Sequence, residues 1–242
     1  GSSSGLFVTE TRGETWAEIG PLPNVVRALA FHPADPRVIY AATWAGGIFT
    51  SIDHGATFAQ CLPQSLMKFP YNYTSSIAVD PETPTVVCAG TGGGGILYSL
   101  DAGATWEIAE TENRFITSMT SGAAHVFAGS EGDGVYRAGE GAPVWHAAGH
   151  GITNAHVKTV VVDPLVPETV YAATWGGGVY RSPDRGAHWI PARRGLSNLV
   201  LPAFAAHPTR FGRLYAATDG SGVFRSDDQG ALWEPIRTGL TA

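Results

Sequence analysis

Four aspartates recur along this chain in one short pattern, Ser-x-Asp-x-Gly, which is followed by Trp or Phe three residues after the glycine. A short carboxylate can accept hydrogen bonds from backbone N–H groups further along the chain, and glycine takes backbone angles that a Cβ would resist. We therefore predict a structural, turn-closing role for Asp53, Asp101, Asp184 and Asp228. Calcium binding is the alternative, but one aspartate per turn is far short of the roughly six to eight oxygen ligands that Ca²⁺ takes.

The other groups that can do chemistry do not form a catalytic or metal-binding set in the sequence. His150 and His156 share one expected loop without a third ligand nearby, so we expect no metal site. Glu131 and Asp133 also share one loop, whereas the two carboxyl groups of a glycoside hydrolase flank the scissile bond. We assign no catalytic residue and expect no cofactor.

The elements that position these residues are repeated. An aromatic residue closes each period, and the successive aromatics are 42, 48, 39, 44 and 44 residues apart; they are Trp16, Phe58, Trp106, Trp145, Trp189 and Trp233. Each period contains four short runs of β-branched, aromatic and small apolar residues, separated by Gly and Pro. This spacing predicts an all-β fold, a β-propeller of four-stranded antiparallel blades. We expect five complete blades over about residues 24–237, preceded by a half blade at 5–20.

The repeated turn resembles the Asp-box (BNR) repeat of sialidases and of many non-enzymatic propellers, including the Ycf48-like photosystem assembly factors. Segments 51–58 and 99–106 match the repeat at every position, and 182–189 and 226–233 match except at its Thr position. The resemblance covers nearly the whole chain and implies a single propeller domain over residues 1–242, or a piece of a longer propeller that begins within a blade. It also favours a secreted or periplasmic location, although no signal peptide is visible.

Two further copies of the turn are degenerate. Thr11 replaces the aspartate in the first copy, and Glu140 and Ala142 replace Asp and Gly in another. The strand at 38–43, followed by a Gly-rich loop, also resembles the repeats of xyloglucanase-type hydrolases. Those enzymes carry catalytic aspartates at a cleft, and no clear counterpart is visible in this chain.

The composition limits the classes of partner. Charged residues make up only 15% of the chain and hydrophobic residues 44%, which is enough for a sizeable core. A net charge of −6 argues against a nucleic-acid partner, because binding of a phosphate backbone needs a concentrated basic surface. No apolar run is long enough to predict a membrane span. Cys61 and Cys88 are too few for a disulfide framework, so we expect buried free thiols.

The candidate ligand-binding residues lie in the loops opposite the aspartate turns, where the sialidases that this chain resembles have their active site. These loops vary from blade to blade, and the candidates are Trp44, Trp175, Arg27, Lys158, Tyr71, Tyr73, Arg114 and Asp219. Arg27 and Lys158 occupy equivalent positions at the start of the innermost strands. Trp44 and Trp175 are also equivalent; they are either exposed platforms for a ligand or caps on neighbouring blades.

These patterns favour a non-catalytic propeller that binds a protein or a glycan on the loop face. Sialidase chemistry needs three arginines for the substrate carboxylate, and that family's Arg-Ile-Pro motif is absent. The alternative is a glycoside hydrolase, sialidase-like or xyloglucanase-like, whose catalytic residues lie partly outside this chain. The acidic charge favours a neutral or basic partner. The incomplete N-terminal blade predicts either self-association or low stability, because it leaves a sheet edge open.

Overall fold

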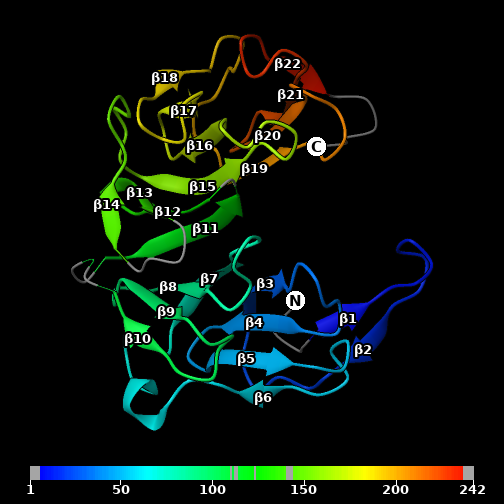
Figure 1. The fold of residues 1–242 in the computed structure, drawn as a ribbon. Coiled ribbons are helices and arrows are strands. Elements are labelled where there is room, and N and C mark those ends of the chain that lie inside the picture. The colour runs from blue at the N-terminus through cyan, green and yellow to red at the C-terminus, as the bar shows by residue number, and fades with distance from the viewer. Residues whose placement is uncertain (1–5, 110, 112–113, 123, 140–143, 237–242) are drawn as a thin grey trace. The chain divides into compact units, whose positions relative to one another are not determined.

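The computed structural model describes residues 6–109, 111, 114–122, 124–139 and 144–236. Within these residues the chain is all-β, apart from one 3-10 turn at Gln64–Leu66. Five four-stranded sheets and one two-stranded sheet follow one another along the sequence, each built from consecutive strands (Figure 1). The predicted all-β class, the four-stranded units and the N-terminal half blade are thereby confirmed. No helix in the described part of the chain is long and apolar enough to cross a membrane.

The sheets belong to two compact units, residues 1–116 with 140–144 and residues 117–139 with 145–242. The strands that begin in the first unit are β1 (Leu6–Val8), β2 (Ala17–Ile19), β3 (Val26–Phe31), β4 (Ile39–Thr43), β5 (Gly47–Ser51), β6 (Ala59–Gln60), β7 (Thr74–Val79), β8 (Val87–Thr91), β9 (Ile96–Ser99), β10 (Glu107–Ile108) and β11 (Ile116–Gly122). The strands of the second unit, which also takes β11 from Thr117 onward, are β12 (His125–Ser130), β13 (Gly134–Gly139), β14 (Trp145–Ala147), β15 (Val157–Val162), β16 (Val170–Thr174), β17 (Gly178–Ser182), β18 (Ile190–Pro191), β19 (Ala203–Ala206), β20 (Leu214–Thr218), β21 (Gly222–Ser226) and β22 (Glu234–Ile236). The expectation of a single domain over 1–242 stays a prediction.

The second strand of a sheet is the most deeply buried, because it lies inside its own sheet and is covered on its faces as well. β4, β8 and β16 are buried at every residue. In the first unit, Tyr40 of β4 packs in one apolar cluster with Ile77 of β7 and with Trp106, and its hydroxyl donates to the carbonyl oxygen of Ala102 at 3.0 Å. Burial on both faces explains why these strands read as continuous apolar runs rather than as an alternation of apolar and polar residues.

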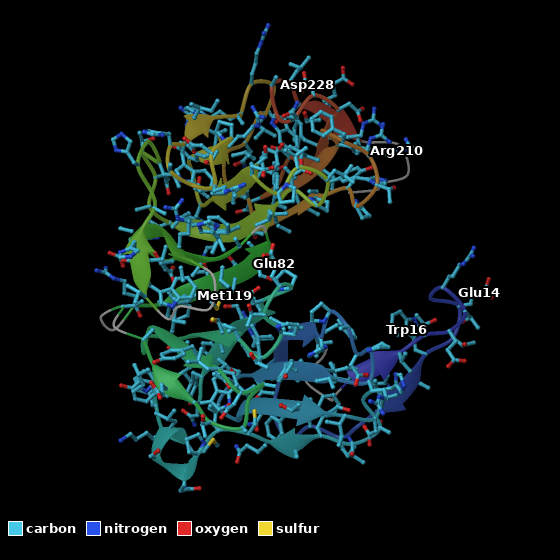
Figure 2. All side chains as sticks on the ribbon, viewed as in Figure 1. Glu14, Trp16, Glu82, Met119, Arg210 and Asp228 are labelled. Carbon is cyan, nitrogen blue, oxygen red and sulfur yellow. The ribbon has the colours of Figure 1, made fainter. Side chains whose placement is uncertain are left out.

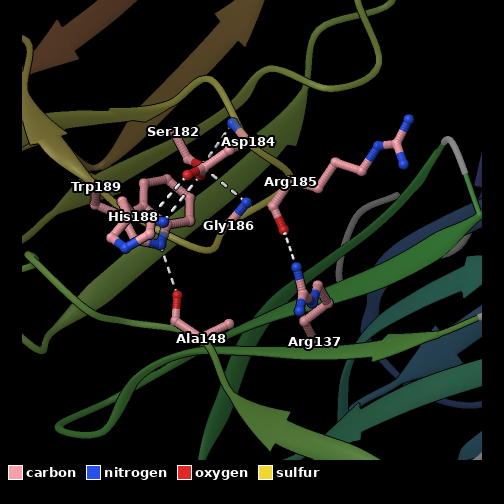
Figure 3. Close-up of polar contacts among 8 residues, drawn as sticks. All are labelled: Arg137, Ala148, Ser182, Asp184, Arg185, Gly186, His188 and Trp189. Carbon is pink, nitrogen blue, oxygen red and sulfur yellow. Dashed lines mark hydrogen bonds and ion pairs between the residues drawn. The ribbon is translucent and has the colours of Figure 1, made fainter.

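The Ser-x-Asp-x-Gly turns are closed by the serine as well as by the aspartate. In the turn of Figure 3, the Ser182 hydroxyl donates to Asp184 Oδ1 at 2.8 Å and accepts the N–H of Gly186 at 2.7 Å. Asp184 Oδ1 also accepts the N–H of His188 at 2.9 Å. Arg185 and Gly186 both have positive φ, 58° and 80°, which is the left-handed region that favours glycine. The sequence pattern predicts a turn-closing role for the aspartate and the glycine only, and the structure adds the serine hydroxyl.

The same turn recurs around Asp53, Asp101 and Asp228, with matching hydrogen bonds from the preceding serine. In the two strict copies, hydrogen bonds to the carboxylate from the hydroxyl and the N–H of the following threonine lower the pKa of Asp53 and of Asp101 to about 2. Burial acts to raise the pKa of Asp184, but the hydrogen bonds from His188 and Ser182 outweigh it and bring that pKa to about 2. A carboxylate that accepts several hydrogen bonds is held in its ionised form.

The degenerate first copy keeps the same geometry with threonines. Thr9 Oγ1 accepts the N–H of Gly13 at 2.8 Å, and Thr11 Oγ1 accepts the N–H of Thr15 at 2.8 Å. Its closing aromatic, Trp16 (labelled in Figure 2), is exposed. The exposed fraction of Trp16 is 61%, whereas that of Trp106 in the equivalent position is 6%. The other degenerate copy, with Glu140 and Ala142, lies outside the described residues.

Candidate binding surface at the loop ends

The loops that follow the second strands are tied to the chain that enters the inner strand of the same sheet. The N–H groups of Trp44, Gly92, Trp175 and Asp219 donate to the carbonyl oxygens of Val25, Tyr73, His156 and Val200, at 2.8 to 3.0 Å. The opposite turns are tied in the same manner: the N–H of Arg185 donates to the carbonyl oxygen of Glu168 at 2.8 Å. Within a sheet, the aspartate turns and the variable loops therefore occupy opposite ends of the strands.

In the first unit, Arg27, Trp44 and Tyr73 come together with two further aromatic residues. The Arg27 guanidinium carbon lies 5.6 Å from the ring centroid of Trp44, which is a cation–π distance. Tyr73 packs edge-on against Trp44 at 5.0 Å. Phe69 packs edge-on against Tyr73 at 5.4 Å, and Phe115 lies 6.5 Å from Trp44. We call these five residues the Trp44 cluster.

A β-bulge sets the direction of the Arg27 side chain. The pairing of β3 with β4 shifts register between Val26 and Ala28, and the pairing of β15 with β16 shifts between Val157 and Thr159. The skipped residues are Arg27 and Lys158. An extra residue in one strand re-aims its side chain and increases the local twist. The sequence predicted that the two cations are equivalent, but it carried no signal of the bulge.

In the second unit, Lys158 repeats the arrangement of Arg27. Its Nζ lies 5.2 Å from the ring centroid of Trp175 and 3.6 Å from Glu131 Oε1. Glu131 offsets the charge of this lysine, so the Lys158 pair differs from the Arg27 pair in local electrostatics. Trp44 and Trp175 belong to different units.

Three of the predicted site residues are engaged in holding the loops. Tyr71 packs against the apolar core of the first unit and beside Gly94, where an added Cβ would lie 2.7 Å from the Tyr71 ring. The carbonyl oxygen of Arg114 accepts the N–H of Gly95 at 3.0 Å. The carbonyl oxygen of Asp219 accepts a hydrogen bond from the side-chain amide of Asn198. For Arg114 and Asp219 these contacts are made by the main chain.

Sequence reasoning missed Phe69 and Phe115. Phe69 lies in the long connection between β6 and β7 and is exposed; Phe115 directly precedes β11 and forms an isolated bridge with Gly92. The signal that could have found Phe69 is the aromatic density of the segment 69–73, which holds three aromatic residues in five positions. Among the described residues, no group of three or more His, Cys, Asp or Glu side chains is arranged to hold a metal ion.

A scan against protein-family models and a search of curated proteins found no match. Among solved structures, a GH74 enzyme from Niastella koreensis is similar with a TM-score of 0.75 at 20% identity, over 96% of this chain and 42% of that one. The GH74 xyloglucanase from Xanthomonas campestris gives a TM-score of 0.74 at 19% identity, over 92% of this chain and 41% of that one. A structure of YCF48 bound to D1 peptide gives 0.71 at 16% identity, over 97% of this chain and 76% of that one.

These similarities confirm that the fold is of the β-propeller class, of the kind found in GH74 enzymes and in YCF48. At identities of 16 to 20% they show the fold alone. The chain spans about two fifths of the length of the two GH74 structures.

Proposed function

We propose that this chain is a non-catalytic propeller module that binds a protein segment through the Trp44 cluster. The observation that carries the proposal is the packing of Arg27 and of the Tyr73 edge against Trp44, with Phe69 packed on Tyr73, at a loop end of the first unit. Aromatic side chains with few rotatable bonds, together with arginine, are the usual anchors of binding surfaces. Trp44 and Phe69 are exposed, so the cluster offers apolar area to a partner.

The share of each similar structure that this chain covers favours a peptide ligand over a glycan. The YCF48 structure contains a bound D1 peptide, and this chain matches three quarters of that protein's length. Arg27 places a positive charge at the cluster, which suits a partner residue with a carboxylate or a carbonyl oxygen. The protein's net charge of −6 favours a partner segment that is neutral or basic overall.

A second candidate is a glycan-active protein, either a glycan-binding module or a glycoside hydrolase whose catalytic residues lie partly outside this chain. The similarity to two GH74 structures favours it. The sugar ring would stack on Trp44 or on Trp175, since both indole rings are exposed. If the ring stacks on Trp175, Asp219 and the Lys158–Glu131 pair of the same unit would line the site.

The test compares ligands and variants in parallel. Purified protein is screened for binding against peptide arrays and against neutral and sialylated glycans, and hydrolysis of xyloglucan and of a fluorogenic sialoside is measured alongside. We expect peptide binding that weakens at least about tenfold in Trp44→Ala, the scale of losing an interface anchor. Trp16→Ala is the matched control, because Trp16 is an exposed tryptophan at an aspartate-type turn. Hydrolysis abolished by Arg27→Ala, or ligand binding unaffected by Trp44→Ala, would contradict the proposal.

A further inference from the structure

The second unit contains a pocket between two of its sheets. The pocket has a volume of about 230 Å³ and lies between the outer strand β18 of one sheet and the aspartate turn that joins β21 to β22 of the next. Its lining residues are Arg181, Ile190–Arg194 and Asp228–Ala231. All of them belong to the second unit, so the pocket is formed within that unit. We call it the Arg181 pocket; it shares no residue with the Trp44 cluster.

The lining of the Arg181 pocket is positively charged overall. Its charged residues are the three arginines Arg181, Arg193 and Arg194 and the single acidic residue Asp228. Burial acts to raise the pKa of Asp228, but hydrogen bonds from the Leu232 N–H and the Ser226 hydroxyl outweigh it and lower that pKa. Asp228 is therefore ionised and held by its own turn. The three arginines still exceed its charge, so the pocket favours an anion.

The guanidinium of Arg181 is positioned but not neutralised. Its Nη2 donates to Oε1 of Gln229 at 2.5 Å. Its Nε is buried without a hydrogen-bond partner among the described residues, and none of their carboxylates forms an ion pair with Arg181. A buried charge without a counter-ion is costly, so an anion beside this guanidinium would be stabilised. The bond from Arg181 also orients the Gln229 amide, and this leaves the NH₂ group of Gln229 as a second donor.

The equivalent arginine of the preceding sheet is engaged differently. Arg137 of β13 has the same register position as Arg181 of β17. Its Nη1 donates to the main-chain carbonyl oxygen of Arg185 at 2.6 Å (Figure 3). Arg185 and Gln229 are also equivalent, because each lies between the aspartate and the glycine of its turn. Arg137 is thus bound to the main chain of the turn, whereas Arg181 is bound to a side chain that itself carries free donors.

A second difference concerns the residues that follow the fourth strands. The carbonyl oxygens of His150 and Arg194 each accept, at 2.9 Å, the N–H of the tryptophan that closes the following turn, so the two residues are equivalent. The ring of His150 packs edge-on against that of His188, with centroids 5.6 Å apart. At the Arg181 pocket these two positions are Arg194 and Leu232, which cannot form such a ring pair. An arginine therefore stands where the preceding pair of sheets has a contact between two histidines.

We propose that the Arg181 pocket binds a phosphate group, either as the free ion or as the monoester of a partner molecule. Arg181, Arg194 and Gln229 supply N–H donors, and arginine matches the oxygens of phosphate through paired hydrogen bonds. A volume of about 230 Å³ holds one phosphate group with several waters, since a water molecule takes about 30 Å³ in the liquid.

The distribution of charge between the two units supports an anionic ligand at this place. Most of the 15 Lys and Arg residues lie in the second unit, whereas most of the 21 Asp and Glu residues lie in the first. The net charge of −6 therefore belongs mainly to the first unit. Arg193 contributes charge more than hydrogen bonds, because its Nη1 donates to the carbonyl oxygen of Gly177 at 2.8 Å.

The experiment measures the binding of inorganic phosphate and of phenyl phosphate to the full chain by isothermal titration calorimetry. The ionic strength is held constant, because salt screens charge interactions. We expect saturable binding that weakens at least about tenfold in Gln229→Glu, since the new carboxylate pairs with Arg181 and repels the anion. Arg194→Gln should also weaken it at least about tenfold, the scale of losing one hydrogen bond to a charged group. Circular dichroism verifies that both variants fold.

Arg210→Gln is the matched control. Arg210 belongs to the same unit but does not line the pocket, so its replacement changes the charge of the unit without changing the site. We expect this variant to bind phosphate with the affinity of the parent chain. Trp44→Ala should bind phosphate unchanged as well, since the inference does not rest on the proposed function.

Three results would overturn the inference. One is the absence of saturable binding of either compound, and another is binding that is unchanged in Gln229→Glu. The third is an equal loss of affinity in Arg210→Gln and Arg194→Gln, which would assign the effect to the overall charge of the unit. Binding of inorganic phosphate alone would support a site for the free ion. Binding of phenyl phosphate as well would support a site for a phosphorylated partner.

Discussion

The guanidinium of Arg27 lies over the indole ring of Trp44, 5.6 Å from its centroid, and Lys158 lies over Trp175 in the same manner at 5.2 Å. The cation comes from a bulge in an inner strand, and the tryptophan is the first residue after a second strand. Ser75 and Thr117 occupy the equivalent position in two other inner strands. Their hydroxyls instead donate to the backbone carbonyl oxygens of Gly90 and Val157. One position of the repeat thus serves either to tie strands together or to place a charge at the loop end.

The first prediction concerns the serine of the turn. Ser99→Ala removes the acceptor for the Gly103 N–H and the donor to Asp101, and it leaves a buried N–H without its partner. We expect a loss of about 1–2 kcal/mol in the free energy of unfolding, measured by urea denaturation. Ser65→Ala is the control, because Ser65 is exposed in the 3-10 turn. Equal stability of the two variants would show that the serine bond is dispensable.

The second prediction concerns the thermal stability of the protein at low pH. The pKa of Asp101 is lowered from 3.8 to about 2 by hydrogen bonds from Thr105 and Ser99. Folding therefore favours the ionised form; this stabilisation is complete above about pH 4 and is lost as the pH falls towards 2. The melting temperature of Asp101→Asn should accordingly fall less steeply between pH 4 and pH 2 than that of the parent chain. Parallel curves for the two proteins would contradict the assignment.

The third prediction compares two glycines with similar backbone angles. Gly151 has φ +101°, and a Cβ there would overlap the carbonyl oxygen of Trp189; Gly132 has φ +105° and open space around it. Gly132→Ala should cost about 1–2 kcal/mol of backbone strain. Gly151→Ala should cost about 1–3 kcal/mol more, because the backbone must also move. Thermal denaturation of both variants checks the difference, and equal losses would show that the close approach is absent.

The fourth prediction concerns the two thiols. Burial raises the pKa of Cys88 to about 12, and burial also raises the pKa of Cys61. Because the thiolate is the reactive form, neither thiol should react readily at neutral pH in the native protein. Cys88 should be labelled by a disulfide reagent only after unfolding, whereas Cys61, which is half-buried, should be labelled slowly in the native protein. Rapid labelling of Cys88 in a Cys61→Ser variant under native conditions would contradict its burial.

The sequence by itself determined the all-β class, the period of the repeat and the equivalence of residues between repeats. Strand runs and turn residues are local signals, and a repeated local signal is hard to misread. It therefore aligned Arg27 with Lys158 and Trp44 with Trp175, and it placed Thr11 at an aspartate position. The hydrogen bond from the Thr15 N–H shows that Thr11 takes over the acceptor role there.

Only the tertiary structure decided which side chains of the variable loops meet. Tyr71 and Tyr73 are two residues apart, but Tyr71 packs on the core while Tyr73 packs on Trp44. Likewise, Leu29 and Ile77 pair with the same position of their second strands, but Leu29 is 38% exposed and Ile77 is 6% exposed. The burial of a side chain depends on the residues that a neighbouring sheet packs against it. Those residues are distant in the sequence, so a local pattern does not predict the burial.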